Sequence, residues 1–371
     1  PLSMTQVAVI GCGVVGAAIA YELSRLPWLT VTLFDHQPPA SGSTGAALGV
    51  LMGAISQKTK GRSWRLRQSS MQRYETLIPE LEALTGLSIP FNRQGILMLC
   101  FAEEEMGRWE KLLEIRRSQG WKLEIWDRSE IQRKCPQLQN EKIVAAIYSP
   151  QDRQVHPTLL TQALVAGAQI NGVNCQFGVK VQNVTSTPPD ASNLSRCCQI
   201  PTTAGTFDVD WLVVAAGLGS TPLTASLKHP VDIRPVLGQA LQLKLPQPLG
   251  NPDFQPAITS GDVHIVPVGE GEYWIGATVE FPDGRGEVVP GPALLEKVRQ
   301  EAIAFCPALA DATAIRTWSG KRPRPEGASA PIIGKLPGYK NVLLAAGHYR
   351  NGILLAPATA QAIRDAIAAG G

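Results

Sequence analysis

The residues best suited to chemistry are three glycines near the start of the chain, Gly11, Gly13 and Gly16, spaced as Gly-x-Gly-x-x-Gly. Gly11 permits a tight turn from a strand into a helix, and Gly13 lets the backbone approach a pyrophosphate closely. Gly16 lets the helix pack against the strand. The N–H groups that open this helix, at Val14 and Val15, carry a partial positive charge that attracts phosphate. The spacing therefore predicts a turn that binds a dinucleotide.

The segments on either side of the glycines support this prediction. The apolar run at 7–10 is typical of a buried parallel strand, and residues 14–26 have a helical pattern. A second apolar strand at 31–34 leads into Asp35 and His36. A carboxylate at that distance from the glycines can accept hydrogen bonds from the ribose hydroxyls of a dinucleotide. Three glycines alone are weak support, but their place between two strands makes the prediction specific.

Composition excludes several classes of protein. The 371 residues are 44% hydrophobic and 18% charged, with a net charge of +3. This balance is typical of a globular protein of two domains and favours neither nucleic acid nor a membrane as partner. The seven cysteines include no C-x-x-C pair, so we expect reduced thiols, no metal site and a cytoplasmic location. We expect neither a secretion leader nor a membrane-spanning run, and we set aside the three residues ahead of Met4 as a cloning remnant.

The chain alternates between two kinds of segment, which predicts two domains. Parallel-strand and glycine-turn patterns occupy 1–85, 148–231 and 318–371. Short strands and helices, many with antiparallel spacing, occupy 86–147 and 232–317. We therefore expect an α/β fold in which a discontinuous dinucleotide-binding domain is interrupted twice by a second, α+β domain.

Three further segments carry local predictions. The small, glycine-rich stretch 41–49 is predicted to be a loop that wraps a cofactor, with a plain surface loop as the alternative. Residues 61–85 have helical apolar spacing, and the arginines between those positions are predicted to be a solvated face. They are Arg62, Arg65, Arg67 and Arg73. The turn 347–352 precedes the last helix and so places a second helix N-terminus near a cofactor. Since an NAD dehydrogenase usually keeps its dinucleotide fold contiguous, this favours FAD over NAD without excluding NAD.

Six pieces of the sequence occur in an order found in a known family. They are GCGVVG, ASGSTGAALG, VVAAGLGS, HIVPVGEGEYWIGATVE, WSGKRPRP and AAGHYRNGILLAPATA. Over essentially the whole chain they resemble the D-amino acid oxidase-like family of FAD-dependent oxidoreductases. The last piece is most similar to bacterial glycine oxidases, which serve the thiazole branch of thiamine biosynthesis. The resemblance implies a discontinuous Rossmann-like FAD domain and a substrate domain with a mixed, mainly antiparallel sheet over the flavin.

The resemblance also implies which residues bind FAD. They are Gly11, Gly13, Val14, Val15, Gly16, Asp35, His36, Ser43, Thr44, Leu48, Gly49, Val50, Val181, Ala216, Gly217, His348, Tyr349, Arg350, Asn351, Gly352, Ile353 and Leu354. Related amine oxidases tether flavin through a histidine or cysteine near its ring system. Neither 41–50 nor 322–331 contains one, so we predict non-covalent FAD.

On the substrate side, Arg322 matches the arginine that holds the substrate carboxylate in a two-point salt bridge, for which a guanidinium fork suits better than a lysine. Arg350 matches a second arginine near flavin and substrate. His264 stands where glycine oxidases have an active-site tyrosine, and Val279 where a larger side chain would limit the pocket. These departures leave the substrate open. The alternatives are a surface arginine in a proline-rich turn at 322 and a plain strand residue at 264.

The activity implied is oxidation of glycine, or of a small amine or D-amino acid, to the imine and then to the 2-oxo acid and ammonia, with O2 reduced to H2O2. A thiazole-forming enzyme is the expected partner, and the oligomeric state stays open. One alternative is a dehydrogenase of D-amino acids or sarcosine that uses another electron acceptor. The other is a dinucleotide-binding protein without redox chemistry. Peroxide yield and flavin reduction by amino acids separate the three.

Overall fold

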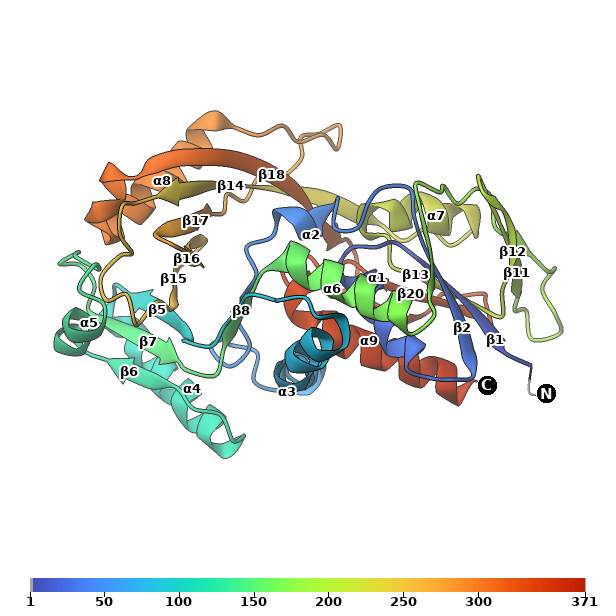
Figure 1. Ribbon diagram of the computed structural model, residues 1–371, viewed down its shortest axis with the longest axis horizontal. Coiled ribbons are helices and arrows are strands. Elements are labelled where there is room, and N and C mark those ends of the chain that lie inside the picture. The colour runs from blue at the N-terminus through green and yellow to red at the C-terminus, as the bar shows by residue number, and fades with distance from the viewer. Residues whose placement is uncertain (1–2, 371) are drawn as a thin grey trace.

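The glycine turn lies at the carboxyl edge of a six-stranded sheet with the order β19-β20-β13-β1-β2-β9 (Figure 1). Its strands are β1 (Thr5–Ile10), β2 (Leu29–Asp35), β9 (Asn174–Phe177), β13 (Trp211–Val214), β19 (Ile332–Lys335) and β20 (Val342–Ala346). All neighbours are parallel except β19 and β20. Because β1 has β2 on one side and β13 on the other, the strand order reverses there, and a crevice forms at the carboxyl ends of these strands.

The computed structural model describes residues 3–370. Residues 1, 2 and 371 of the predicted segments 1–85 and 318–371 lie outside the described residues, as do two of the three residues ahead of Met4. Within 3–370, no helix has both the length and the apolar character needed to cross a membrane.

The strands of the six-stranded sheet alternate between two cores, as period-2 side chains require. Val7 and Val9 pack in a core with the helices, whereas Ala8 and Ile10 pack in a core on the opposite face. The helices are α1 (Val14–Ser24), α3 (Gly61–Thr85), α6 (Pro157–Ile170) and α9 (Gly352–Ala369), and they pack on one another (Figure 1). The opposite face is covered by the small sheet β10 (Thr185–Ser186), β11 (Cys197–Thr202) and β12 (Gly205–Asp208).

A second large sheet lies mainly on the left of Figure 1 and has eight strands in the order β18-β14-β17-β16-β15-β5-β7-β6. Its strands are β5 (Ile96–Cys100), β6 (Glu124–Trp126), β7 (Ala145–Ser149), β14 (Ile233–Lys244), β15 (Ala257–Ser260), β16 (Val263–Gly269), β17 (Glu272–Gly276) and β18 (Thr313–Pro325). Within it only β15 and β5 pair in parallel. The mixed, mainly antiparallel sheet that the resemblance implied is therefore confirmed.

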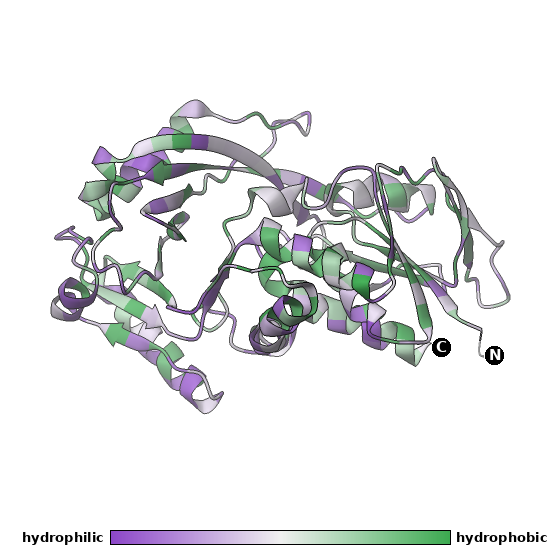
Figure 2. Ribbon diagram, viewed as in Figure 1, coloured by the Kyte–Doolittle hydropathy of each residue, from purple (hydrophilic) through white to green (hydrophobic). Residues whose placement is uncertain are grey.

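Three helices accompany this sheet, and a short sheet lies beside it. The helices are α4 (Met106–Ser118), α5 (Arg128–Lys134) and α8 (Pro292–Phe305), and the short sheet contains β3 (Val50–Leu51), β4 (Phe91–Asn92) and β8 (Arg153–Val155). Residues of α5 and α8 share a core with the strands. Polar and apolar positions alternate along most helices, as expected for elements with one buried face (Figure 2).

Helix α6 illustrates how local sequence fixes an element's start. Pro157 occupies its first turn, where a missing N–H has no consequence. His156 precedes it in an extended conformation, and its ring Nδ1 accepts a hydrogen bond from the N–H of Leu159 at 3.2 Å. This histidine is therefore a helix cap.

Two local predictions hold only in part. The stretch 41–49 contains one helical turn, α2 (Ser43–Ala46), which packs against β18. The helix 61–85 has the predicted bounds, but its arginines are not all solvated, because Arg67 and Arg73 are buried. Arg73 forms ion pairs with Glu22 of α1 and Glu80 of its own helix. Arg73 is therefore buried because a carboxylate on a neighbouring helix pairs with it, whereas its spacing along α3 alone had predicted an exposed side chain.

Strand β18 (Thr313–Pro325) extends beyond the strand 315–320 that the apolar pattern predicts. It runs on through 321–325, the proline-rich segment that could have been a turn, and pairs with β14 over its length. The predicted domain boundary between 317 and 318 falls inside this strand. The division into two domains remains a prediction.

Candidate active site

A cavity of about 1370 Å³ is lined by residues of both large sheets. It is larger than the roughly 300–1,000 Å³ typical of pockets for small ligands, so it has room for a dinucleotide and a small substrate together. Every predicted site residue lines this cavity except Gly16. Tertiary structure therefore brings together segments that lie more than 300 positions apart, from Gly11 to Leu354.

The glycine turn is held by two close backbone approaches. Gly11 has φ +108°, and a Cβ there would lie 2.2 Å from the carbonyl oxygen of Ala215 at the end of β13. A Cβ at Gly16 would lie 1.7 Å from the carbonyl oxygen of Gly11. Gly16 thus serves packing of α1 on the turn. Gly13 differs, because its Cβ would meet a side chain, the Thr44 hydroxyl, at 3.0 Å.

The start of α1 and the acid at the end of β2 are both fixed by hydrogen bonds. The N–H of Val14 donates to Oγ1 of Thr44 at 2.9 Å. Oδ2 of Asp35 accepts from the N–H of Cys12 at 2.7 Å, and Oδ1 accepts from the N–H of Gln37 at 2.9 Å. Since each carboxylate oxygen has two lone pairs, Asp35 retains acceptor capacity toward the cavity.

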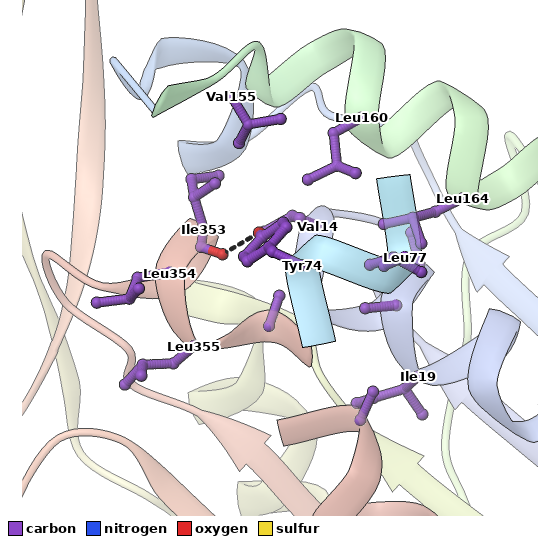
Figure 3. Packing of buried hydrophobic residues seen from close by; sticks show 14 of the residues in the cluster. Val14, Ile19, Tyr74, Leu77, Val155, Leu160, Leu164, Ile353, Leu354 and Leu355 are labelled. Carbon is purple, nitrogen blue, oxygen red and sulfur yellow. Dashed lines mark hydrogen bonds between the residues drawn. The ribbon is translucent and has the colours of Figure 1, made fainter. Parts of the chain in front are cut away.

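A second helix N-terminus lies on the cavity wall at the start of α9. Buried Tyr74 of α3 is bonded to the start of this helix, since its hydroxyl donates to the carbonyl oxygen of Ile353 (Figure 3). Val14, at the start of α1, belongs to the same hydrophobic core. The turn before α9 includes Tyr349 at φ +55°, a left-handed conformation that a non-glycine residue rarely adopts. Its N–H donates to the carbonyl oxygen of Pro323 in β18 at 3.0 Å, which ties this turn to the eight-stranded sheet.

His348, in the same turn, lines the cavity, and its ring is bonded to another residue of the protein. Its Nε2 lies 3.0 Å from Oγ1 of Thr359 in α9, and the residue is buried. Burial lowers the pKa of His348 to about 3. The ring is therefore neutral at pH 7 and serves as a structural link between the turn and the helix.

Arg322 is partly buried on the cavity wall, and its guanidinium is already oriented. Nη1 donates to the carbonyl oxygen of Leu237 at 3.2 Å, and Nη2 donates to that of Thr278 at 3.0 Å. Two of the five guanidinium donors are thus used, which leaves three for a ligand. Burial, followed by the charge of Arg350, lowers the pKa of Arg322. This arginine is a desolvated cation, and a carboxylate would relieve its unfavourable position.

Arg350 and His264 lie at the same end of the cavity as Arg322. Arg350 is exposed and donates from Nη1 to Oδ1 of Asp262 at 2.9 Å. Burial lowers the pKa of His264 to about 4, with Asp262 opposing and Arg322 and Arg350 adding to that effect. Within the described residues, the buried Nδ1 of His264 has no hydrogen-bond partner. A neutral imidazole beside two guanidiniums is suited to hydrogen bonding with a polar ligand. Val279 lines the same cavity.

Sequence reasoning missed three residues of this region. Asp262 belongs to a Ser-Gly-Asp turn, and only the cross-chain contact with Arg350 distinguishes it from any turn acid. Thr278 contributes a carbonyl oxygen, which no side-chain pattern reveals. Gly238 did carry a signal, because an isolated glycine inside a strand often marks a close approach. The atom that approaches is Nη2 of Arg322, 2.4 Å from where a Cβ would be.

The residues present fit FAD. A helix N-terminus with a closely approachable glycine suits a pyrophosphate, and Asp35 suits a ribose. The second helix N-terminus, at α9, lies near the arginine end, where partial positive charge would favour the negative charge of a reduced flavin ring. The cavity also leaves a cationic region for an anionic substrate.

Comparisons with known proteins agree with this fit. The family model described as FAD dependent oxidoreductase matches residues 6–366. The chain is 29% identical to the glycine oxidase of Geobacillus kaustophilus, over 98% of this chain and 92% of that protein. It is 32% identical to the bifunctional protein ThiO/ThiG of a Synechocystis species over 98% of this chain but 51% of that protein, so it spans about half that relative's length. The crystal structure of glycine oxidase from Geobacillus kaustophilus has a TM-score of 0.85 and 28% identity, with 99% of this chain and 95% of that chain covered.

Proposed function

Because the chain belongs to the family of FAD dependent oxidoreductases, we propose that it oxidises the amine of a small amino acid to an imine. Glycine is the first substrate to test, followed by sarcosine and a small D-amino acid. The imine hydrolyses in water to the 2-oxo acid and ammonia, and dioxygen is reduced to hydrogen peroxide. The relatives named glycine oxidase support this assignment.

The observation that carries the proposal is the oriented, desolvated guanidinium of Arg322 on the wall of the shared cavity. A cation in that position binds the carboxylate of an amino acid and fixes the direction of its α-carbon. Charge-assisted, two-point bonds are stronger than neutral ones and define the ligand's orientation. Arg322 therefore works by positioning, which can supply much of the rate of a bimolecular reaction.

The other residues at this end set the electrostatics and the width of the site. His264 remains neutral at pH 7, because burial lowers its pKa to about 4. It therefore adds hydrogen bonding without adding positive charge, and the substrate amine can bind in its neutral form. Val279 lines the cavity where a larger side chain would limit the pocket, so it leaves more room beside the substrate. FAD, when bound, supplies the two-electron acceptor that C–N oxidation requires.

FAD is proposed to bind without a covalent bond. The segments 41–50 and 322–331 contain no histidine or cysteine, and the ring of His348 is bonded to Thr359 of α9. Acid precipitation of the purified protein should release the yellow chromophore completely into the supernatant. Colour that stays in the pellet would mean covalent attachment.

A thiazole-forming enzyme is the proposed consumer of the imine. Support comes from the relative whose name joins two components, ThiO and ThiG, in one protein of about twice the matched length. The test is whether addition of such an enzyme lowers the yield of 2-oxo acid and ammonia without lowering substrate consumption.

The deciding experiment follows the absorbance spectrum of the purified protein during anaerobic addition of glycine. Bleaching of the flavin band, with peroxide in stoichiometric yield once air is admitted, supports an oxidase. Bleaching without peroxide, together with dye reduction, indicates a dehydrogenase instead. A flavin that stays oxidised with glycine, sarcosine and D-alanine would contradict the amino acid assignment.

A further inference from the structure

We propose that Glu280 and Gly238 are positioning residues for Arg322: the carboxylate of Glu280 holds together the two segments that supply its backbone acceptors, and Gly238 leaves room for its guanidinium. The inference rests on the proposed function in one respect, that Arg322 binds the substrate carboxylate.

The two acceptors of the Arg322 guanidinium come from separate segments. Leu237 belongs to β14, and Thr278 belongs to the extended segment after β17. These segments pair through the backbone at Leu237 and Glu280, which exchange two N–H to O=C bonds of 2.9 Å. Movement of one segment against the other would separate the two carbonyl oxygens and misdirect the guanidinium.

The side chain of Glu280 reinforces this pairing from the side away from the cavity. Val279 lines the cavity, whereas Thr278 and Glu280 do not, as expected from alternation along an extended chain. Glu280 is 7% exposed, and its Oε2 accepts from Oγ1 of Thr278 at 2.6 Å and from Nε2 of Gln239 at 2.9 Å. Its carboxylate thus links the segment of Thr278 to β14, directly behind Arg322.

The same carboxylate also fixes a loop of the cavity wall. Oε1 of Glu280 accepts from the N–H of Gly291 at 2.8 Å, and Nε2 of Gln239 donates to the carbonyl oxygen of Gly291 at 2.9 Å. The loop 281–290 therefore starts directly after Glu280, and the residue that follows its end, Gly291, is bonded to the same side chain. Residues 288–290 of this loop line the cavity. The orientation of Arg322 and the position of this loop therefore both depend on the buried carboxylate of Glu280.

Gly238 provides the second requirement, which is space. A Cβ at this position would lie 2.4 Å from Nη2, 2.7 Å from Cζ and 2.8 Å from Nη1 of Arg322. Real Cβ atoms do not approach other atoms this closely, so any larger residue must displace the guanidinium. Gly238 has no positive φ, so backbone strain does not complicate its substitution.

The test uses Glu280→Gln and Gly238→Ala, with glycolate as probe because it carries a carboxylate but no amine. A glutamine amide cannot accept from Gln239 or Gly291 with its NH2 group, so at least one of the three bonds is lost. Glycolate binding to the FAD-loaded protein, measured by calorimetry, should weaken about 10-fold in each variant, as for loss of one buried hydrogen bond. KM for glycine should rise in parallel while kcat and FAD affinity change much less.

Two matched controls separate positioning from general stability. Glu22→Gln alters a carboxylate that is also buried, 2% exposed and paired with Arg73, but remote from the cavity wall. Gly284→Ala places a methyl group where no atom lies within 4 Å. Glu22→Gln should lower thermal stability, and neither control should change glycolate affinity.

The variant Arg322→Ala distinguishes failure of the positioning role from failure of the proposed function. The proposal is supported if Arg322→Ala loses glycolate binding, Glu280→Gln and Gly238→Ala bind glycolate more weakly, and the two controls bind it as the wild type does. If Arg322→Ala loses binding but the two variants bind glycolate as the wild type does, the positioning role is overturned and the proposed function stands. If Arg322→Ala binds as tightly as the wild type, both are overturned. Should Glu280→Gln fail to fold, Gly238→Ala gives the decision.

Discussion

Arg350 and Asp262 form an ion pair at the exposed rim of the cavity, with Nη1 and Oδ1 2.9 Å apart. The pair joins the turn before α9 to the turn between β15 and β16, and both side chains are about half exposed. Exposed pairs contribute little to stability and are screened by salt. The main effect of Asp262 is therefore electrostatic, because it cancels a positive charge that acts on Arg322.

Asp262→Asn should strengthen the binding of anionic ligands. Without the carboxylate, Arg350 adds its charge to that of Arg322, so KM for glycine should fall about 2- to 5-fold at low ionic strength, as expected for an exposed charge worth up to ~1 kcal/mol. The gain should shrink in 0.5 M salt. Asp253→Asn, an exposed acid outside the cavity wall, is the control. A rise in KM would show instead that Asp262 holds Arg350 in its working position.

Arg322→Lys should separate charge from geometry. Lysine keeps the positive charge but loses the planar fork that reaches Leu237, Thr278 and a ligand at once. We expect KM for glycine to rise about 10- to 100-fold, the range for loss of hydrogen bonds to a charged group. Arg324→Lys, two positions along β18 and outside the cavity wall, should leave KM unchanged. Equal KM values for Arg322→Lys and wild type would argue against two-point binding.

Gly13→Ala and Gly16→Ala should fail in different ways. A Cβ at Gly16 meets a carbonyl oxygen at 1.7 Å, so the fold itself is strained, by about 3 kcal/mol in unfolding free energy. A Cβ at Gly13 meets only the Thr44 hydroxyl, at 3.0 Å, and faces the cavity. That variant should fold and bind FAD about 10-fold more weakly, equivalent to ~1.4 kcal/mol. Thermal unfolding without added FAD and fluorescence titration with FAD measure the two effects; wild-type FAD affinity in Gly13→Ala would count against the phosphate-binding turn.

His264 should make the protein less stable in acid. Its pKa in the folded protein is lowered from 6.5 to about 4 by burial. As pH falls below 6.5, the unfolded chain takes up a proton that the folded chain excludes, so stability declines between pH 6.5 and 4. At pH 5 this amounts to about 2 kcal/mol relative to pH 7.5.

The measurement is urea unfolding of wild type and His264→Gln at pH 7.5 and pH 5.0, at saturating FAD. The difference between the two pH values should be smaller in the variant by the amount that His264 contributes. His229→Gln, at an exposed histidine, should behave as the wild type does. Parallel pH dependence in wild type and His264→Gln would remove His264 as the source.

Local pattern was a reliable guide where an element carries its own signals. The bounds of the helix 61–85 and the strand–glycine–helix order of residues 5–24 followed from spacing and glycine chemistry. The resemblance then named residues from segments far apart in the chain, and all of them except Gly16 line one cavity. What each of these residues does at that wall stays a prediction, which the variants above test.

Charge placement could not be read from pattern. The arginines of helix 61–85 have the spacing of an exposed face, yet Arg73 is buried because Glu22 and Glu80 meet it there. From the sequence alone, Arg322 could equally lie in an exposed turn. In the structure β18 extends through Arg322, and Leu237 of β14 supplies a carbonyl oxygen to its guanidinium.

By itself, the sequence determined the dinucleotide turn and the alternation of the two kinds of segment, because these depend on local conformation and on spacing along one strand or helix. Most of the candidate cofactor residues followed instead from the resemblance to a known family. Only the tertiary structure decided that Glu280 and Gly238 lie behind Arg322 and that Asp262 pairs with Arg350. Such relationships arise where strands far apart in the chain pair with one another, and the free energy of a buried or paired charge depends on all of its neighbours at once.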